Sequence, residues 1–264
     1  MSAAARSRRK LTIAAALALA FALSTLAQAE VVQRGGLRVT FEGELTPRKL
    51  PRHGGAPVRV SIGTKIASSD GGAAPQLRKI EIAINRYGRF DSSGLPKCTE
   101  REIQPATTQN ALAACGDSLV GAGSFAANVL FKEQVPYPAA GKLYAFSGTF
   151  HGRPAILAHV YGTKPVPTSF TFPFVLRKAK GVYGTVLSAS FPQVTGNAGY
   201  VTALSLNLGK VFKSHGKRHS FLSASCPAPK GFPGAAFPLA RATLSFPGQT
   251  LSSTLTRECR ARGD

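Results

Sequence analysis

Apolar and polar residues alternate with a period of two along most of this chain. In the clearest case, Phe170, Phe172 and Phe174 alternate with Thr and Pro, and the same period recurs at residues 80–84 and 204–208. Successive side chains of a β-strand point to opposite faces of a sheet, so each segment has one face that can be buried. The pattern predicts strands rather than helices.

Turns rich in Gly and Pro separate these segments at short and even spacing. Examples are His-Gly-Arg-Pro at residues 151–154 and Pro-Gly at 247–248. Gly and Pro supply the backbone angles that tight turns need. From about residue 141 onwards, these turns separate eight expected strands. Earlier strands are expected at 37–45, 58–66, 77–85 and 119–131. The spacing predicts an all-β fold, an antiparallel β-sandwich of about ten to twelve strands.

One short helix is expected in an insert between residues 85 and 118. Residues 107–114 include several alanines, Thr107 or Thr108 can cap the start, and Gly116 follows the end. The insert would be closed by a disulfide between the cysteines that flank the helix.

Four cysteines, Cys98, Cys115, Cys226 and Cys259, give an even number that predicts two disulfides in an oxidising compartment. Of three possible pairings we expect Cys98–Cys115 and Cys226–Cys259, because each pair is close in sequence and belongs to one local unit. Zinc binding is the alternative, but the chain has no Cys-x-x-Cys pair. We therefore expect no metal and no cofactor.

The first 29 residues have the three parts of a bacterial-type signal peptide. A basic segment at residues 6–10 precedes an apolar run at 11–23, and Ala-Gln-Ala at 27–29 offers small residues to a signal peptidase. The run is too short for a stable anchor, since a membrane-spanning helix needs roughly 20 apolar residues. We expect cleavage after Ala29, no transmembrane anchor, and a single secreted or cell-envelope domain at 30–264.

The paired Arg8 and Arg9 resemble a twin-arginine export signal. Paired arginines are also common in ordinary signal peptides. The general secretory route is therefore the expected one.

Lys and Arg outnumber Asp and Glu by 33 to 12, which gives a formal net charge of +21. The excess is concentrated in residues 134–264, whose only acids are Glu258 and Asp264. Such a chain attracts acidic polymers and anionic surfaces. The densest basic cluster lies in an expected turn at residues 210–219, and it comprises Lys210, Lys213, Lys217 and Arg218. A solvated turn kept soluble by its charge is the alternative interpretation.

These features predict a non-enzymatic exported protein that binds acidic cell-wall polymers or anionic surfaces through its basic C-terminal half. Nucleic acid is not expected as its partner in vivo. Two other classes stay open, a secreted hydrolase with an unrecognised site and a carrier of an apolar ligand between the sheets. The stripe Phe170–Phe172–Phe174 could line such a ligand pocket, although alternating Phe is also what a sandwich core requires.

Residues 116–119, Gly-Asp-Ser-Leu, match the nucleophile block of the GDSL-type ester hydrolases. In that family a His preceded by Asp three residues earlier completes the triad near the C-terminus. Here no Asp lies between Asp117 and Asp264, so no His has that partner. A Ser hydroxyl without an oriented base is not an activated nucleophile. We interpret the block as a turn that enters a strand, and we expect no catalytic residue.

The sequence Leu-Ser-Ala-Ser-Cys-Pro-Ala-Pro-Lys-Gly-Phe at residues 222–232, with Pro-Lys-Cys at 96–98, resembles a group of uncharacterised secreted proteins of actinobacterial type. The likeness covers most of the chain after the signal peptide. It implies secretion and disulfide bonds, and it implies no activity.

Overall fold

The computed structural model describes residues 29–131, 135–191 and 199–262. Strands dominate these ranges, and helices are confined to one short insert. The all-β fold expected from the period-two pattern is confirmed. Within the described ranges, no helix has the length and apolar character needed to cross a membrane.

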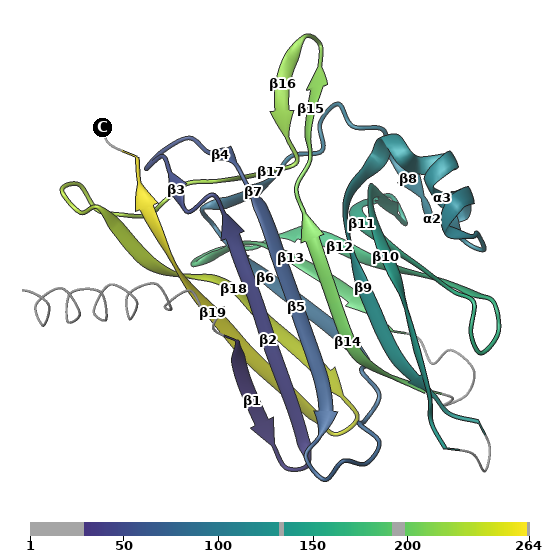
Figure 1. Cartoon of the computed structure of the whole chain (residues 1–264). Helices are drawn as coiled ribbons and strands as arrows, with labels where there is room; N and C mark the ends of the chain where they lie inside the picture. The colour runs from purple at the N-terminus through teal and green to yellow at the C-terminus, as the bar shows by residue number, and fades with distance from the viewer. Residues whose placement is uncertain (1–28, 132–134, 192–198, 263–264) are drawn as a thin grey trace, which may run out of the picture.

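One sheet of 14 strands forms most of the molecule (Figure 1). From edge to edge its strands are β1 (Glu30–Arg34), β2 (Leu37–Thr46), β5 (Arg59–Ser68), β14 (Gly199–Leu208), β9 (Leu119–Val129), β10 (Tyr137–Phe150), β11 (Arg153–Gly162), β12 (Thr168–Lys178), β13 (Tyr183–Ser190), β6 (Lys79–Asn85), β18 (Gly234–Phe246), β19 (Gln249–Ala261) and β3 (Lys49–Leu50). The short strand β8 (Cys98–Thr99) pairs with β10. All neighbours are antiparallel except the two-residue pairings of β8 and β3.

The sheet curls until its two halves face each other, which gives a sandwich-like body with one main core. At the place where the first and last long strands meet, the Arg257 side chain of β19 donates a hydrogen bond from Nε to the carbonyl of Gly43 in β2, 2.7 Å away. Leu255 of β19 packs against the same glycine, where a Cβ atom would lie 2.9 Å from its Cδ1. Close packing of side chains therefore joins strands that no backbone ladder connects.

The faces predicted from the alternation are the faces that the fold buries. Phe172 and Phe174 of β12, and Leu204 and Leu206 of β14, are buried in the main core. Ile82 of β6 packs in the same core. These three strands therefore contribute alternate residues to the main core, as strands of a sheet with one core-facing side should.

Five shorter strands complete the β structure. A three-stranded sheet consists of β4 (Ala56–Pro57), β17 (Leu222–Ala224) and β7 (Gly88–Phe90), and a separate hairpin consists of β15 (Val211–Ser214) and β16 (Lys217–Ser220). The sequence expectations did not include most of these elements, because strands of two to four residues show no measurable period. The β15–β16 hairpin projects beyond the sheet (Figure 1).

A helical insert covers part of the outer surface of the main sheet. It contains α2 (Glu100–Ile103), α3 (Thr108–Cys115) and a 3-10 turn at Gly116–Ser118. The expected helix is α3, and its expected cap is confirmed because Thr107 Oγ1 accepts a hydrogen bond from the backbone N–H of Asn110. The four-residue helix α2 was missed. Beneath the insert lies a second, smaller core.

Both expected disulfides, Cys98–Cys115 and Cys226–Cys259, are present. Cys98–Cys115 ties β8 to the end of α3, and Cys226–Cys259 ties the segment after β17 to β19. We call the end of the molecule that carries both bonds and the β15–β16 hairpin the hairpin end. Its segments are residues 46–59, 86–118, 150–153, 178–182, 209–234 and 257–262.

Candidate functional site

A cavity of about 400 Å³ opens at the end of the molecule opposite the hairpin end. It lies against the inward faces of five neighbouring strands, β14, β9, β10, β11 and β12. Ligand pockets in proteins have volumes of roughly 300–1,000 Å³ and predominantly apolar linings. The size and lining of this cavity therefore fit a site for a small apolar molecule.

Small residues at inward-facing positions create this hollow. Ala127 of β9, Ala139 of β10 and Gly162 of β11 occupy places where larger side chains would fill the space. A Cβ atom added at Gly162 would have no neighbour closer than 3.9 Å. Further along the same face of β10, Leu143 is fully buried. Along β10 the inward side chains thus change from large ones, which fill the core, to small ones, which leave the cavity open.

Aromatic rings form the deep wall of the cavity. The Phe172 ring lies 5.4 Å from that of Phe125 and 4.8 Å from that of Phe191, measured between centroids. Phe170 stacks beside Phe172 at 6.3 Å. Both interpretations of the Phe stripe therefore apply, because Phe174 belongs to the core while Phe170 and Phe172 also line the cavity.

Most polar groups in the lining already have partners. Gln76 Nε2 donates to the carbonyl of Gly199 at 3.1 Å. Asn128 Nδ2 donates to the hydroxyl of Tyr200 at 2.8 Å. Thr168 Oγ1 donates to a backbone carbonyl of its own loop. These side chains hold the walls together and leave the lumen apolar.

Exposed apolar side chains lie around the mouth. Phe131 and Val166 line the cavity and are 40% and 61% exposed. Tyr137, the first residue of β10, is also exposed, and it is paired with Val129, which lines the cavity. Single exposed apolar residues are common, but a group beside an apolar cavity is typical of a binding site.

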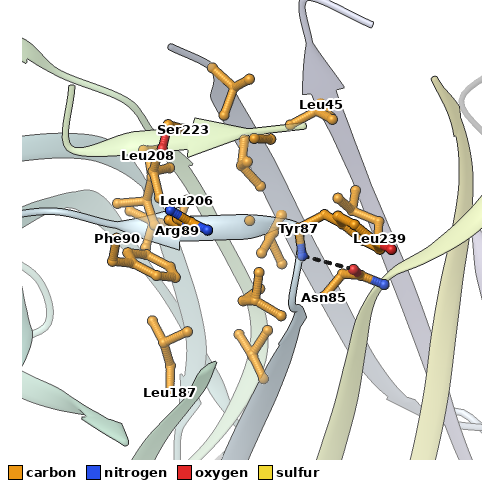
Figure 2. A pocket seen from close by; sticks show the side chains of 18 of the residues that line it. Leu45, Asn85, Tyr87, Arg89, Phe90, Leu187, Leu206, Leu208, Ser223 and Leu239 are labelled. Carbon is orange, nitrogen blue, oxygen red and sulfur yellow. Dashed lines mark hydrogen bonds between the residues drawn. The ribbon is translucent and has the colours of Figure 1, made fainter. Parts of the chain in front are cut away.

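A second cavity lies within the core and is much smaller, about 50 Å³ (Figure 2). Figure 2 shows side chains such as Leu45, Leu187 and Leu239 around it. Its buried polar residue Asn85 is satisfied, since Oδ1 accepts from the N–H of Tyr87 and Nδ2 donates to the carbonyl of Pro238. The space is on the scale of a few water molecules, so we interpret it as a packing gap.

The basic cluster expected at residues 210–219 is divided by the β15–β16 hairpin. Lys213 and Arg218 are directly opposite each other and share one face. Lys217, opposite Ser214, belongs to the other face. Lys210 lies at the base, where Nζ donates to the carbonyl of Asp117. The structure therefore brings together two of the four predicted residues.

An acid that is distant in sequence approaches the hairpin. Asp91 Oδ2 lies 3.8 Å from His219 Nδ1, and the His219 ring stacks on Phe212 with centroids 5.5 Å apart. The N–H of Ser93 holds the pKa of Asp91 below its usual value, with a further contribution from His219. Asp91 therefore remains ionised and offsets part of the positive charge.

Charge is distributed unequally between the ends. The segments of the hairpin end contain 19 Lys and Arg against five Asp and Glu, whereas the other described residues contain nine against five. Residues far apart in sequence contribute, because Lys49 of β3 is paired with Arg260 of β19. The basic surface is thus broader than the predicted turn.

No family model, curated protein or solved structure matches the chain. The resemblance carried by residues 222–232 and 96–98 stays a prediction. The arrangement of this chain's own residues carries the functional argument.

The block at residues 116–119 folds as a 3-10 turn that leads directly into β9. Ser118 is 3% exposed, so its side chain is enclosed by protein. Cys98, Glu102 and Cys115 form the closest grouping of potential metal ligands among the described residues. Both sulfurs are consumed by the disulfide, which leaves that group without thiolate ligands.

Sequence reasoning gave no weight to His159, which is fully buried on the side of β11 that faces the helical insert. Neither ring nitrogen has a hydrogen-bond partner within the described residues, and the same holds for the hydroxyl of Thr171, its cross-strand neighbour. Burial lowers the pKa of His159, and the nearby carbonyl of Ile103 opposes the shift without meeting hydrogen-bond geometry. The ring is therefore held in its neutral form.

Proposed function

We propose that this protein is an exported, non-enzymatic binding protein that holds an apolar ligand in the 400 Å³ cavity. The observation that carries the proposal is an apolar hollow with an open mouth on one side of an otherwise well-packed core. Protein interiors are normally packed as densely as organic crystals, with few voids larger than water. A void of this size costs packing energy, which a bound ligand would restore.

Filling the cavity should abolish binding. In Gly162→Leu the new side chain should enter the lumen, because Gly162 lines the cavity on the same face of β11 as Val160, and the added Cβ meets no atom closer than 3.9 Å. Titration with N-phenyl-1-naphthylamine, an uncharged dye that fluoresces in apolar surroundings, should give saturable binding to the wild-type protein. Gly162→Leu should weaken that binding at least tenfold.

A matched control is Gly116→Leu, which adds the same side chain at the hairpin end, where a Cβ would meet nothing within 4 Å. Gly116→Leu should bind the dye as tightly as the wild type does. Thermal unfolding of both variants checks that they are folded. Saturable dye binding that Gly162→Leu leaves unchanged would contradict the proposed site.

Export is part of the proposal, since two disulfides are typical of oxidising compartments. The expected signal peptide lies almost wholly outside the described residues, and β1 begins at Glu30, directly after the expected cleavage point. N-terminal sequencing of the protein from medium or envelope should give a chain that starts at Glu30. A chain that keeps Met1 or Ser2 would contradict it.

A second candidate function is adhesion to acidic polymers through the hairpin end. It is favoured by the 19 Lys and Arg in those segments against five acids. Such contact would rest on charge and fall steeply with salt. The two candidate functions use opposite ends of the molecule, so one protein can have both.

We propose no hydrolytic role for Ser118. A screen of ester substrates against the wild type and Ser118→Ala should find no turnover that depends on the hydroxyl, because the side chain is enclosed. Hydrolysis that disappears in the variant would overturn this assignment.

A further inference from the structure

We infer that the ligand is an amphiphile with an acidic head group, whose apolar tail lies in the cavity and whose head lies beside Lys164 at the mouth. This inference rests on the proposed binding function and adds the chemical class of the ligand. Within the described lining, Lys164 is the one charged residue, and no Asp or Glu is present.

The other polar side chains of the lining offer little to a charged head group. The amides of Gln76 and Asn128 and the hydroxyl of Thr168 each donate to a partner in the protein. The ammonium group of Lys164 has no hydrogen bond or ion pair with any residue that the structure describes. It is therefore the charged group of the described lining that is free to receive a ligand anion.

The position of Lys164 matches the boundary between head and tail. The loop between β11 and β12 carries both Lys164 and the exposed Val166, and both line the cavity. Phe170, further along β12, lies on the inner wall. A ligand that entered here would pass from a cationic, solvent-exposed rim to an aromatic interior.

The positive charge of Lys164 favours an acidic head group over a neutral or basic one. A carboxylate or phosphate can accept hydrogen bonds from the ammonium group, and such charge-assisted bonds are stronger than neutral ones. An amine head group would bring a second cation to the mouth, and the described part of the lining contains no acid to offset it. Because Lys164 is exposed, solvent screens the effect, and a preference of about five- to tenfold is expected.

Competition among ligands of equal chain length tests the inference. Tetradecanoate, monotetradecyl phosphate, tetradecanol and tetradecylamine would each displace N-phenyl-1-naphthylamine from purified protein at pH 8 and low salt. Both anions should bind about five- to tenfold more tightly than the alcohol, and the amine should bind most weakly. Comparing the two anions distinguishes a fatty-acid head from a phosphate head.

Substitution of the lysine provides the second arm. Lys164→Gln should lower the affinity for both anions about five- to tenfold and leave the affinity for tetradecanol unchanged. Lys142→Gln is the matched control, because Lys142 is exposed on β10 and does not line the cavity. It should leave all four affinities unchanged.

The outcomes separate this inference from the function on which it rests. If the dye and tetradecanol bind but the anions show no advantage, or if Lys164→Gln leaves the anions unaffected, the cavity is a ligand site and the acidic head group is wrong. If neither the dye nor any tetradecyl compound binds, both the inference and the proposed function are wrong.

Discussion

The two ends of this molecule are built on the same strands but in opposite ways. The hairpin end carries both disulfides, the helical insert and 19 Lys and Arg residues. At the other end, the described residues contain no disulfide, several inward positions carry small residues, and exposed apolar side chains lie at the mouth of the cavity. The same strands therefore present different loops and different side-chain sizes at the two ends.

Each end gives up stability in its own way. At the hairpin end, like charges repel one another, and two covalent links offset part of that cost. At the cavity end, small residues such as Ala139 and Gly162 forgo contacts that larger side chains would make. Both kinds of cost are typical of surfaces that bind.

The largest expected effect is on core packing. Phe146 is fully buried beneath the helical insert, so Phe146→Ala should lower the free energy of unfolding by about 3–5 kcal/mol. Phe170→Ala should cost less than about 2 kcal/mol, because one side of that ring already faces the cavity. Denaturant unfolding measures both. Equal losses would show that the cavity end is packed as tightly as the rest.

Removal of a disulfide comes next. Replacing Cys226 and Cys259 together by Ser opens a link that spans 33 residues, and replacing Cys98 and Cys115 opens one that spans 17. The chain-entropy model gives losses of about 3–4 and about 3 kcal/mol. Dye binding by folded protein should be unchanged in both double variants, since neither bond contacts the cavity. Loss of binding would mean that the two ends are coupled.

Acid should destabilise the protein partly through His159. Because its pKa is lowered in the folded state, folding favours the neutral ring. The contribution of neutral His159 to the free energy of unfolding is therefore fully present above the ordinary His pKa near 6.5, and it is lost as the pH falls below that value. His159→Leu should unfold less readily than the wild type at pH 5, with a smaller difference at pH 8. His53→Leu, at an exposed position, should show no such pH dependence.

The smallest effect on stability is expected at the β15–β16 hairpin. Changing Lys210, Lys213, Lys217 and Arg218 to Gln should leave stability within about 1 kcal/mol and lower the salt needed to elute the protein from heparin. The control removes four charges from the rest of the molecule, at Arg34, Arg38, Lys65 and Lys142, all of them exposed. Equal shifts in both variants would mean that net charge alone governs retention.

Local signals in the sequence were sufficient for the local structure. Period-two runs marked the buried faces of β6, β12 and β14, and a cap residue with a following Gly marked α3. Proximity in the chain was enough to pair the cysteines. Helix α2 was missed although Thr99 and Glu102 form a capping box at its start, in which the backbone N–H of Thr99 donates to Glu102 Oε2 at 2.6 Å. The two-residue strands have no such signal, because their form depends on the neighbours that contact them.

The sites depend on register, which a single sequence does not encode locally. Ala127, Gly141 and Gly162 are separate small residues in the sequence, and only pairing of their strands brings them around one hollow. In the same way Lys49 and Arg260 meet only because β3 joins β19. The Phe stripe was visible as a pattern, but the space beside it was not.

The order of strands has a consequence for when the chain can fold. β5 is bordered by β2 and β14, and β6 is bordered by β13 and β18. Strands early in the sequence therefore pair with strands that come much later in the chain. Such non-local pairing raises contact order and slows folding. A chain that still lacks β18 leaves β6 without one of its two neighbours, so it cannot complete its sheet. Its topology thus delays closure until the last hairpin, β18–β19, has emerged.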